Sequence, residues 1–398
     1  MPWCSTKHLT VLERYFTQFY QIFLSTPNLN IFKGARGMRD QAYQICRDYL
    51  SGSWKSISSN DMVFRSISGG MSNLLYYCSL PETHTPLVGE PRQVLMRMYG
   101  QIHEGAEAKV TESVIFMMLS ERKLGPKLYG IFPGGRLEEY IPARALICDE
   151  LKDPELSATI ARKLAKVHTL NVPINKEPTW LFEKMENWVK FAKNDVRIEC
   201  IKDDVRVLAS QLLSQDFEGE FSWLKSVLTK VKSPVLFCHN DLQEGNILVP
   251  ERADSGEDKI VFIDFEYCSY NFRGFDLANH FCEWCFDYSL PEYPHFLSKP
   301  SEYPSVDQQL NFIRSYLQNL DDKSEDVDCE EHILKEVSLF ILASHFLWTL
   351  WSVVNAQNSQ IEFGYWEYGK ARWDEYMKHK TELLKEDGLI RLLGSIDA

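Results

Sequence analysis

The sequence lacks an excess of positive charge. Its 398 residues contain 43 Lys and Arg against 56 Asp and Glu, which gives a formal net charge of -13 and a pI of about 5.3. Such a surface repels phosphate backbones and anionic lipid headgroups, so we expect no nucleic-acid partner. The same balance is compatible with a cationic ligand.

Paired cysteine motifs are also scarce. There are ten cysteines, and the one close pair is Cys282 and Cys285 in "FCEWCF". No second CxxC completes a zinc site, and the pair has helical spacing, so we interpret it as two packed thiols. A disulfide framework is not expected in a chain of this length. We therefore expect a protein of the reducing cytoplasm.

Neither a secretory signal nor a run of bilayer length is evident. The first 23 residues carry charges among their apolar positions and predict an amphipathic helix. The most apolar run, Ser338–Val354, falls short of a bilayer span and contains His345. We predict a buried helix there and no stable membrane insertion.

What the chain does contain is enough apolar residues, 44%, for a large core in two lobes. Residues 1–140 alternate short strand-like segments and turns, with one helical segment ending at Gly125-Pro126. Residues 141–398 are mainly helical. The pattern predicts an α+β fold with a small antiparallel sheet lobe followed by a larger helical lobe.

The second lobe is interrupted by a hairpin pattern that carries polar residues. "LFCHNDLQEGNILV" (236–249) and "IVFIDFEY" (260–267) are strand-like runs joined by a polar loop. A hairpin brings Asn246 beside Asp264, with Asp241 close by. Two oxygen ligands on adjacent strands suit Mg²⁺, and a separate carboxylate suits a base that receives a hydroxyl proton.

These residues resemble the catalytic loop and metal-binding strand of the protein-kinase-like fold, H-x-D-x-x-x-x-N followed by I-D-F. Asn240 and Glu266 stand where protein kinases have Arg and Gly. Those departures favour relatives that phosphorylate small-molecule hydroxyls, such as aminoglycoside phosphotransferases. Five longer stretches indicate one family among these relatives. They are "SGGMSNLLYYCSLP", "LMRMYG", "GPKLYGIFPGGRLEEYIP", "VLFCHNDLQEGNILV" and "IDFEYCSYNFRGFDLANHFCEW", and all resemble the choline/ethanolamine kinase family.

The resemblance implies transfer of a phosphoryl group from ATP to choline, the first step of phosphatidylcholine synthesis. Asp241 would accept or orient the substrate hydroxyl, and Asn246 and Asp264 would hold Mg²⁺ against the ATP phosphates. Gln243 would position the phosphate or the base. Asp276 is expected to brace the catalytic loop. The family also tends to form homodimers.

Nucleotide binding is expected mainly in the first lobe. The turn "ISGGMSN" offers a close backbone approach and side-chain donors to phosphates, through Ser68, Gly69, Gly70, Ser72 and Asn73. Arg97 stands where kinases place a strand lysine, and Glu112, with Glu107 as a rival, would pair with it. Residues 138–141 would form the adenine hinge, with contacts at Glu139 and Ile141.

Choline has no N–H to donate to an acceptor, so its recognition requires aromatic faces and nearby carboxylates. The resemblance assigns this role to six residues, namely Glu283, Tyr288, Trp348, Trp351, Tyr365 and Tyr368. From spacing alone, aromatic residues three apart on a helix are more often core. A full aromatic cage favours choline, whereas a primary ammonium can be served by carboxylates.

Three alternatives remain at this stage. An ethanolamine kinase would share the same machinery, and some activity on both substrates is expected. A non-catalytic scaffold of the same fold would require loss of Asp241, Asn246 or Asp264, yet all three are present. An aminoglycoside kinase would prefer an open acidic groove to a cage of Trp and Tyr.

Overall fold

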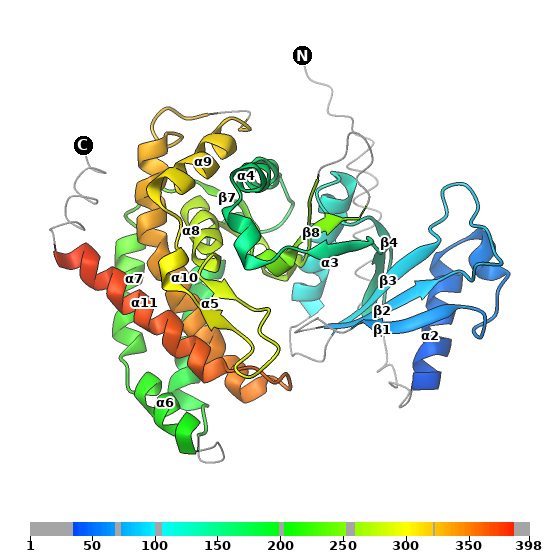
Figure 1. Cartoon of the computed structure of the whole chain (residues 1–398), viewed down its shortest axis with the longest axis horizontal. Coiled ribbons are helices and arrows are strands. Elements are labelled where there is room, and N and C mark those ends of the chain that lie inside the picture. The colour runs from blue at the N-terminus through cyan, green and yellow to red at the C-terminus, as the bar shows by residue number, and fades with distance from the viewer. Residues whose placement is uncertain are drawn as a thin grey trace. The chain divides into compact units, whose positions relative to one another are not determined.

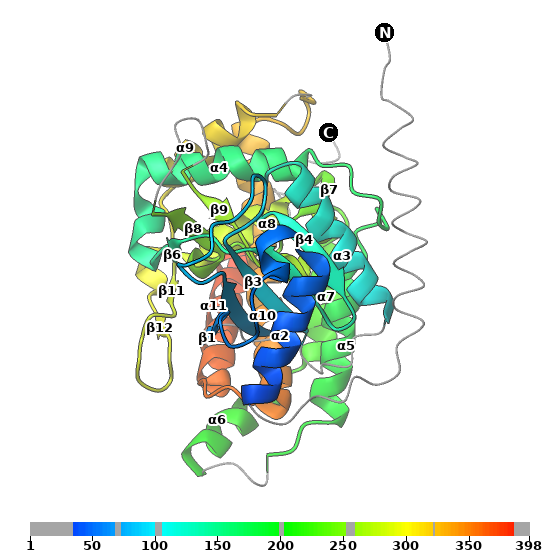
Figure 2. The same ribbon diagram turned by 90° about the vertical axis from the view of Figure 1, so that its right-hand side faces the viewer.

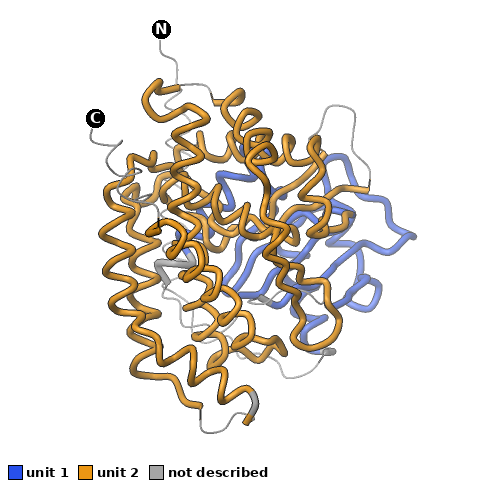
Figure 3. The backbone as a smooth tube through the Cα atoms, turned by 60° about the vertical axis from the view of Figure 1, so that its left-hand side comes forward, with its two compact units in different colours: residues 1–142 blue, residues 143–398 orange. Residues whose placement is uncertain are grey.

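The structure is a computed structural model that describes residues 35–67, 73–99, 106–198, 203–251, 259–320 and 323–385. The chain forms two compact units, one up to Pro142 and one from Ala143 onward (Figure 3). Each unit is described separately below. The helix predicted at the N-terminus and the "SGGMS" turn, residues 68–72, lie outside the described residues.

The first unit is built on an antiparallel sheet of five strands in the order β1-β2-β3-β5-β4. In chain order its elements are α2 (Ala35–Tyr49), the 3-10 turn η1 (Gly52–Lys55), β1 (Val63–Ile67), β2 (Asn73–Ser79), β3 (Gln93–Tyr99), α3 (Ala106–Glu121), β4 (Leu128–Phe132) and β5 (Gly135–Glu139). The order of strands and helix is the one predicted from the sequence.

Successive side chains of these strands point to opposite faces of the sheet, and one face forms a core. Cys78 on β2, Val94 and Met96 on β3 and Leu137 on β5 are all fully buried on one face. Helix α2 covers that face with Ala42 and neighbouring side chains. Figure 2 shows α2 lying across the strands.

The second unit is mainly helical. Its larger elements are α4 (Pro154–His168), α5 (Trp180–Asn194), α6 (Asp203–Leu213), α7 (Phe217–Leu228), α8 (Arg273–Glu283), α9 (Val306–Leu317), α10 (Glu330–Asn358) and α11 (Tyr365–Lys385). Its strands are β6 (Ala143–Ala145), β7 (Val235–Cys238), β8 (Ile247–Pro250), β9 (Val261–Phe262), β10 (Ser269–Phe272), β11 (Phe286–Asp287) and β12 (Leu297–Ser298).

Local sequence signals define several of these helices. Asp153 caps α4 by accepting a hydrogen bond from the Leu156 backbone, and Pro154 occupies the first helical position. Ser305 and Gln308 form a capping box at the start of α9. Such caps satisfy backbone groups that the first helical turn leaves without partners.

Helix α10 is the centre of the second unit and packs against α11, α8 and α5 (Figure 1). Among the described helices it is the one long and apolar enough to cross a bilayer, and 83% of its most apolar window is buried inside the fold. It contains the Ser338–Val354 run, for which burial was predicted.

Two small sheets of this unit position the polar residues singled out from the sequence. Strand β7 pairs with β10, and β8 lies between β6 and β9. Strands β8 and β9 form the predicted hairpin, with Ile247 opposite Phe262. The loop from β7 to β8 contains Asp241 and Asn246, and Asp264 follows β9.

Candidate functional site

The loop after β7 is held by a carboxylate from α8. Asp276 accepts hydrogen bonds from the backbone N–H groups of His239 and Asn240, each at 2.8 Å. Asn240 adopts a left-handed conformation with φ 67°, which asparagine tolerates better than most residues. The bracing role predicted for Asp276 is confirmed.

Asp276 is itself fixed from α4. The Nε2 atom of His168 lies 2.8 Å from Asp276 Oδ2, and its Nδ1 atom lies 2.8 Å from the Tyr316 hydroxyl. Burial would raise the pKa of Asp276, but the hydrogen bond and charge of His168 outweigh it and the pKa lies below its ordinary value. Asp276 is therefore an ionised, fully buried anchor for the loop.

The same carboxylate belongs to a possible metal cluster. Ligand atoms of His168, Cys238 and Asp276 lie within 4.8 Å of one another. However, the two oxygens of Asp276 already accept three hydrogen bonds between them. We therefore interpret this group as the anchor of the loop.

The predicted proximity of Asn246 and Asp264 follows from the hairpin register. The Ile263 N–H donates to the Asn246 carbonyl at 3.0 Å, so Asp264 is one residue beyond the position that faces Asn246. The side-chain nitrogen of Asn246 donates to Asp241 Oδ2 at 3.0 Å and to the Asp241 carbonyl at 2.8 Å. Asp264 has φ 62°, a conformation that non-glycine residues keep only where the surroundings enforce it.

This arrangement fits a hard divalent cation. Because the nitrogen of the Asn246 amide is engaged with Asp241, its oxygen is the atom left to act as a ligand. Asp264 adds a carboxylate from the adjacent strand end. Amide and carboxylate oxygens are the donors that Mg²⁺ prefers.

The electrostatics of the site are strongly negative. Burial raises the pKa of Asp241 well above its ordinary value, and the nearby charges of Glu283, Asp264 and Glu266 raise it further. Three neighbouring carboxylates disfavour ionisation of Asp241, so a cation bound beside it would stabilise the site. Both Mg²⁺ and a cationic substrate would supply the positive charge that compensates these carboxylates.

Gln243 has a local structural contact. Its side-chain oxygen accepts a hydrogen bond from the Gly245 N–H at 2.6 Å and caps the short 3-10 turn η3, Glu244–Asn246. This contact sets the turn that presents Asn246. The role of Gln243 in positioning the phosphate or the base stays a prediction.

A cluster of aromatic rings lies in the same unit. Trp348 and Trp351 are 5.6 Å apart between ring centroids, and Trp351 and Tyr368 are 6.1 Å apart. Tyr288 meets Tyr368 at 6.1 Å. These contacts bring together four of the five aromatic residues assigned to the substrate pocket, and Tyr365 and Glu283 adjoin them.

Tyr365 occupies the edge of this cluster. Its ring centroid lies 5.7 Å from that of Trp351, and its hydroxyl donates to Ser359 Oγ at 2.7 Å. Tyr365 and Tyr368, three residues apart on α11, therefore both pack against Trp351.

Tyr267 joins the carboxylates to the aromatic cluster, and the sequence analysis did not single it out. Its hydroxyl accepts a hydrogen bond from Trp351 Nε1 at 3.1 Å, and its ring lies 5.8 Å from Trp348. Burial raises its pKa, and the charges of Glu266 and Asp241 raise it further. The available signal was its position three residues after Asp264 in "IDFEYCSY".

Glu283 differs from the expectation of a carboxylate available to the substrate. It is 1% exposed and forms an ion pair with Arg372 of α11. Its other oxygen accepts a hydrogen bond from the Tyr288 hydroxyl at 2.8 Å. The charge of Glu283 is therefore matched by a guanidinium inside the protein.

Arg372 is a second residue that the sequence analysis missed. Besides Glu283 it donates to the Tyr368 hydroxyl at 2.9 Å, and its guanidinium lies 3.7 Å from the Phe286 ring centroid. Its spacing of four from Tyr368 was the signal in "YGKAR". Glu283 and Arg372 together hold the hydroxyls of Tyr288 and Tyr368.

In the first unit the predicted pairing of Arg97 with Glu112 is wrong. Glu112 contacts Arg136 at 2.5 Å, and Arg97 contacts Glu138 at 3.4 Å. Arg136 also contacts Glu138, at 2.7 Å. Glu138, which was predicted to belong to the adenine hinge, is almost fully buried on β5 and contacts both arginines. The side chain of the rival Glu107 lies outside the described residues.

The other residues proposed to bind nucleotide are only partly described. Glu139 ends β5, and its N–H donates to the Lys127 carbonyl at 2.8 Å. Ile141 is half-buried just beyond the strand. Asn73 begins β2, but its side chain lies outside the described residues, as do Ser68, Gly69, Gly70 and Ser72.

Comparison with known proteins identifies the family. A family model described as choline/ethanolamine kinase matches residues 64–377. A choline/ethanolamine kinase from Homo sapiens is 46% identical over 358 residues, which cover 88% of this chain and 88% of the relative. Choline kinase alpha from Mus musculus is 45% identical over 371 residues, covering 87% of this chain and 81% of the relative.

A solved structure shows the same fold. The choline kinase from Cryptosporidium parvum is 27% identical and superimposes with a TM-score of 0.72, covering 90% of this chain and 99% of that one. The fold is thus that of protein-kinase-like phosphotransferases, and the predicted α+β class is confirmed. The chain belongs to the choline/ethanolamine kinase family.

Proposed function

We propose that this protein phosphorylates the hydroxyl of choline with ATP to give phosphocholine, with ethanolamine as a second substrate. The observation that carries the proposal is the contact of Tyr267 with Trp351 and Trp348, together with the charge of Asp241, which helps to raise the pKa of Tyr267. A small amino alcohol is short, so its hydroxyl and its cationic end need recognition sites close together. Tyr267 connects those two sites within one unit.

Asp241 would receive the proton of the substrate hydroxyl or orient that hydroxyl for attack. Asn246 fixes the Asp241 carboxylate through its side-chain nitrogen. Asn246 and Asp264 would hold Mg²⁺, which neutralises charge on the ATP phosphates. The loop brace from Asp276 keeps Asp241 in place, which matters because phosphoryl transfer depends on alignment.

The cationic end of choline would meet the faces of Trp348, Trp351 and Tyr368. Since Arg372 neutralises Glu283, we assign Glu283 to holding the Tyr288 hydroxyl. Long-range attraction for the cation would come from Asp241, Asp264 and Glu266. A ring-lined site of this kind binds a trimethylammonium better than a primary ammonium, which favours choline over ethanolamine.

ATP would be bound by the "SGGMS" turn and Asn73, by Arg97, and by the backbone at Glu139 and Ile141. Within the first unit, the two ion pairs of Glu138 keep Arg97 and Arg136 ordered on neighbouring strands. Glu112 belongs to this network through Arg136. We propose that this network supports a guanidinium that binds phosphate.

Steady-state kinetics with Mg-ATP and either choline or ethanolamine tests the proposal. We expect turnover of both, with the higher kcat/KM for choline. A higher kcat/KM for ethanolamine would reverse the substrate assignment. No turnover of either substrate by protein that still binds Mg-ATP would leave a non-catalytic scaffold as the better explanation.

We further propose a cytoplasmic homodimer. Among the described residues eight cysteines are unpaired thiols, seven of them buried, which is consistent with a reducing compartment. Sedimentation equilibrium tests the dimer directly. A mass of one chain, 46.3 kDa, at all micromolar concentrations would exclude it.

A further inference from the structure

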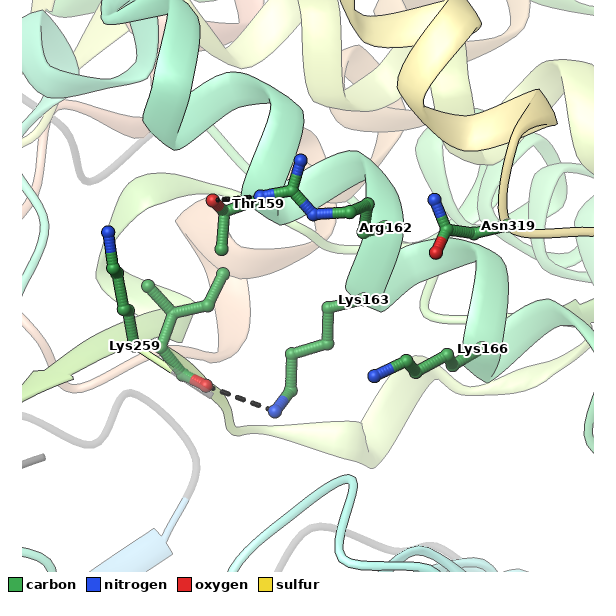
Figure 4. Close-up of a pocket in the computed structure, with 7 residues that line it drawn as sticks. Thr159, Arg162, Lys163, Lys166, Lys259 and Asn319 are labelled. Atoms are coloured by element: carbon green, nitrogen blue, oxygen red, sulfur yellow. Dashed lines mark hydrogen bonds between the residues drawn. The ribbon is translucent and has the colours of Figure 1, made fainter. Parts of the chain in front are cut away.

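Three lysine or arginine side chains are buried among the described residues of the second unit, and their partners differ in kind. The Nζ atom of Lys163 on α4 donates to the Ile260 carbonyl at 3.0 Å, beside the pocket shown in Figure 4. Arg273 on α8 pairs with two carboxylates, one of them on α10. These two cations join elements of the fold. Arg372 on α11 instead contacts residues of the aromatic cluster.

The contacts of Arg372 engage three polar groups of that cluster. Its Nη2 atom pairs with Glu283 and lies 3.4 Å from the Tyr288 hydroxyl, and its Nε atom donates to the Tyr368 hydroxyl at 2.9 Å. Its guanidinium lies 3.7 Å from the ring centroid of Phe286 and 5.0 Å from that of Tyr368. One arginine therefore occupies a carboxylate and two hydroxyls at once.

Stability alone does not account for this buried ion pair. Replacing both members of such a pair by apolar side chains of similar volume is often neutral or stabilising, because both charges lose their hydration on burial. In addition, the Nη1 atom of Arg372 is buried without a hydrogen-bond partner among the described residues, which costs free energy. The pair is better explained by its effect on the groups that it contacts.

The other polar atoms of the ring cluster are also engaged within the protein. The indole nitrogens of Trp348 and Trp351 donate to neighbouring side chains at 2.6 and 3.1 Å. The hydroxyls of Tyr288 and Tyr368 lie 3.0 Å apart, and Tyr288 also donates to Glu283 at 2.8 Å. With these groups engaged, the cluster offers the faces of its rings to a ligand.

We propose that Arg372 is the residue that makes this site select a quaternary ammonium over a primary ammonium, an inference that rests on the proposed amino-alcohol kinase activity. A primary ammonium carries three N–H donors, and burying them without acceptors costs free energy. A trimethylammonium carries none and is bound by ring faces. By engaging Glu283 and the two tyrosine hydroxyls, Arg372 withholds acceptors from the primary ammonium.

Arg372 acts through its neighbours and needs no contact with the substrate. Its charge cancels that of Glu283, so the pair as a whole neither attracts nor repels a cation strongly. Without Arg372, Glu283 would be a bare carboxylate able to accept hydrogen bonds from an ammonium. Without Glu283, an uncompensated guanidinium would repel every cationic substrate. The two single changes therefore have different expected effects.

The test is to measure kcat/KM for choline and for ethanolamine on the same preparation of each variant. In Arg372→Met the ratio of choline to ethanolamine should fall by about tenfold or more, the contribution of a hydrogen bond to a charged group. The change should lie in the KM for the two amines, with the KM for ATP almost unchanged. Because both amines are measured on one preparation, the ratio does not depend on the fraction of protein that is folded.

Three further variants show whether the freed carboxylate is the cause. Glu283→Gln/Arg372→Met removes that carboxylate and should restore the ratio toward the wild-type value. Arg372→Lys keeps a charge opposite Glu283 and should retain most of the preference for choline. Lys370→Met, which removes a positive charge from an ion pair with Asp374 on the same helix, is the control and should have the wild-type ratio. A wild-type ratio in Arg372→Met, or equal ratios in Arg372→Met and the double variant, would overturn the proposal.

If Arg372→Met yields no folded protein, Glu283→Gln provides the test. Its unpaired guanidinium should raise the KM for both amines by a similar factor, and an unchanged KM for both would overturn the proposal. Failure of the proposed function is distinguishable, since the wild type would then turn over neither amine. In that case the same ratio, measured as dissociation constants by titration with choline and with ethanolamine, still decides the role of Arg372.

Discussion

At the scale of single residues, two aspartates near the loop after β7 have pKa values that are shifted in opposite directions. Asp276 is anchored by three hydrogen bonds and kept ionised, whereas burial and neighbouring carboxylates raise the pKa of Asp241. The first is suited to hold structure and the second to exchange a proton. These roles can be separated by experiment.

Asp241→Asn should reduce kcat by roughly a hundredfold to ten-thousandfold, the usual contribution of a positioned base. The amide preserves the size of the side chain and its contact with Asn246, so Mg-ATP binding should survive. Single-turnover kinetics and nucleotide titration measure the two effects. Retained turnover would reject Asp241 as the base.

Asp276→Asn should destabilise the protein by about 3–5 kcal/mol, because an amide nitrogen would face buried N–H donors where a carboxylate oxygen now accepts. Urea unfolding measures this change. We also expect a lower kcat with little change in the KM for ATP, since the loop that presents Asp241 loses its anchor. Asp374→Asn, at an exposed residue of α11 paired with Lys370, is the control and should change neither quantity. A normal kcat in Asp276→Asn would contradict the bracing role.

At the scale of elements, α10 and α11 build the aromatic cluster and α8 connects it to the catalytic loop. One face of α10 supplies Trp348 and Trp351, and α11 supplies Tyr368 and Arg372. Trp348 Nε1 donates to Asn279 of α8 at 2.6 Å, while Asn279 Nδ2 contacts the Asn240 carbonyl at 3.4 Å. The ring cluster and the loop therefore share a direct hydrogen-bonded connection.

Trp351→Ala should raise the KM for choline by roughly thirtyfold, since a desolvated cation–π contact contributes about 2 kcal/mol. The KM for ATP should change little. Trp373→Ala is the matched control, because Trp373 packs with Phe346 and Tyr376 in a separate aromatic group. An unchanged KM for choline in Trp351→Ala would mean that this ring is core only.

Arg372→Met should cost about 3–5 kcal/mol of stability, because it leaves the Glu283 carboxylate buried without its partner. The KM for choline should also rise, as the hydroxyls of Tyr288 and Tyr368 lose their common support. The double variant Glu283→Gln/Arg372→Met should recover much of the stability. If the two single changes add without recovery in denaturant unfolding, the pair is not coupled.

At the scale of the whole molecule, buried histidines make stability depend on pH. Burial lowers the pKa of His280 to about 4, while its Nδ1 contacts the Leu242 carbonyl at 2.9 Å. In the unfolded chain a histidine has a pKa near 6.5. Between about pH 6.5 and 4 this histidine is therefore protonated in the unfolded chain but not in the native protein. The free energy of unfolding consequently decreases as the pH falls.

His280→Gln removes this contribution while keeping an amide that can donate to Leu242. We expect the free energy of unfolding of the wild type, relative to the variant, to decrease by about 1.4 kcal/mol per pH unit from pH 6.5 toward 4. Denaturant unfolding of both proteins across this range measures the difference. Parallel pH profiles would show that His280 titrates normally in the native protein.

Local pattern was sufficient to predict much of this protein. The succession of strands and helix along the small sheet lobe, and the hairpin that brings Asn246 near Asp264, could be stated from the sequence. The reason is that the periodicity of apolar residues and a hairpin turn both constrain residues that are close in the chain. The bracing role of Asp276 was expected at a position that matches the resembled family. The aromatic positions were also found, although spacing alone could not separate a ligand cage from core.

The partners of the buried charges were decided only by the tertiary structure. Arg97 meets Glu138, Arg136 meets Glu112, and Arg372 meets Glu283 across 41, 24 and 89 residues of sequence. Any of several carboxylates could have satisfied each arginine, and which one did depends on how strands and helices pack. The sequence by itself determined which chemical groups are present and their local order. Packing then decided that Glu283 is neutralised by Arg372, and that Tyr267 contacts Trp351 and Trp348.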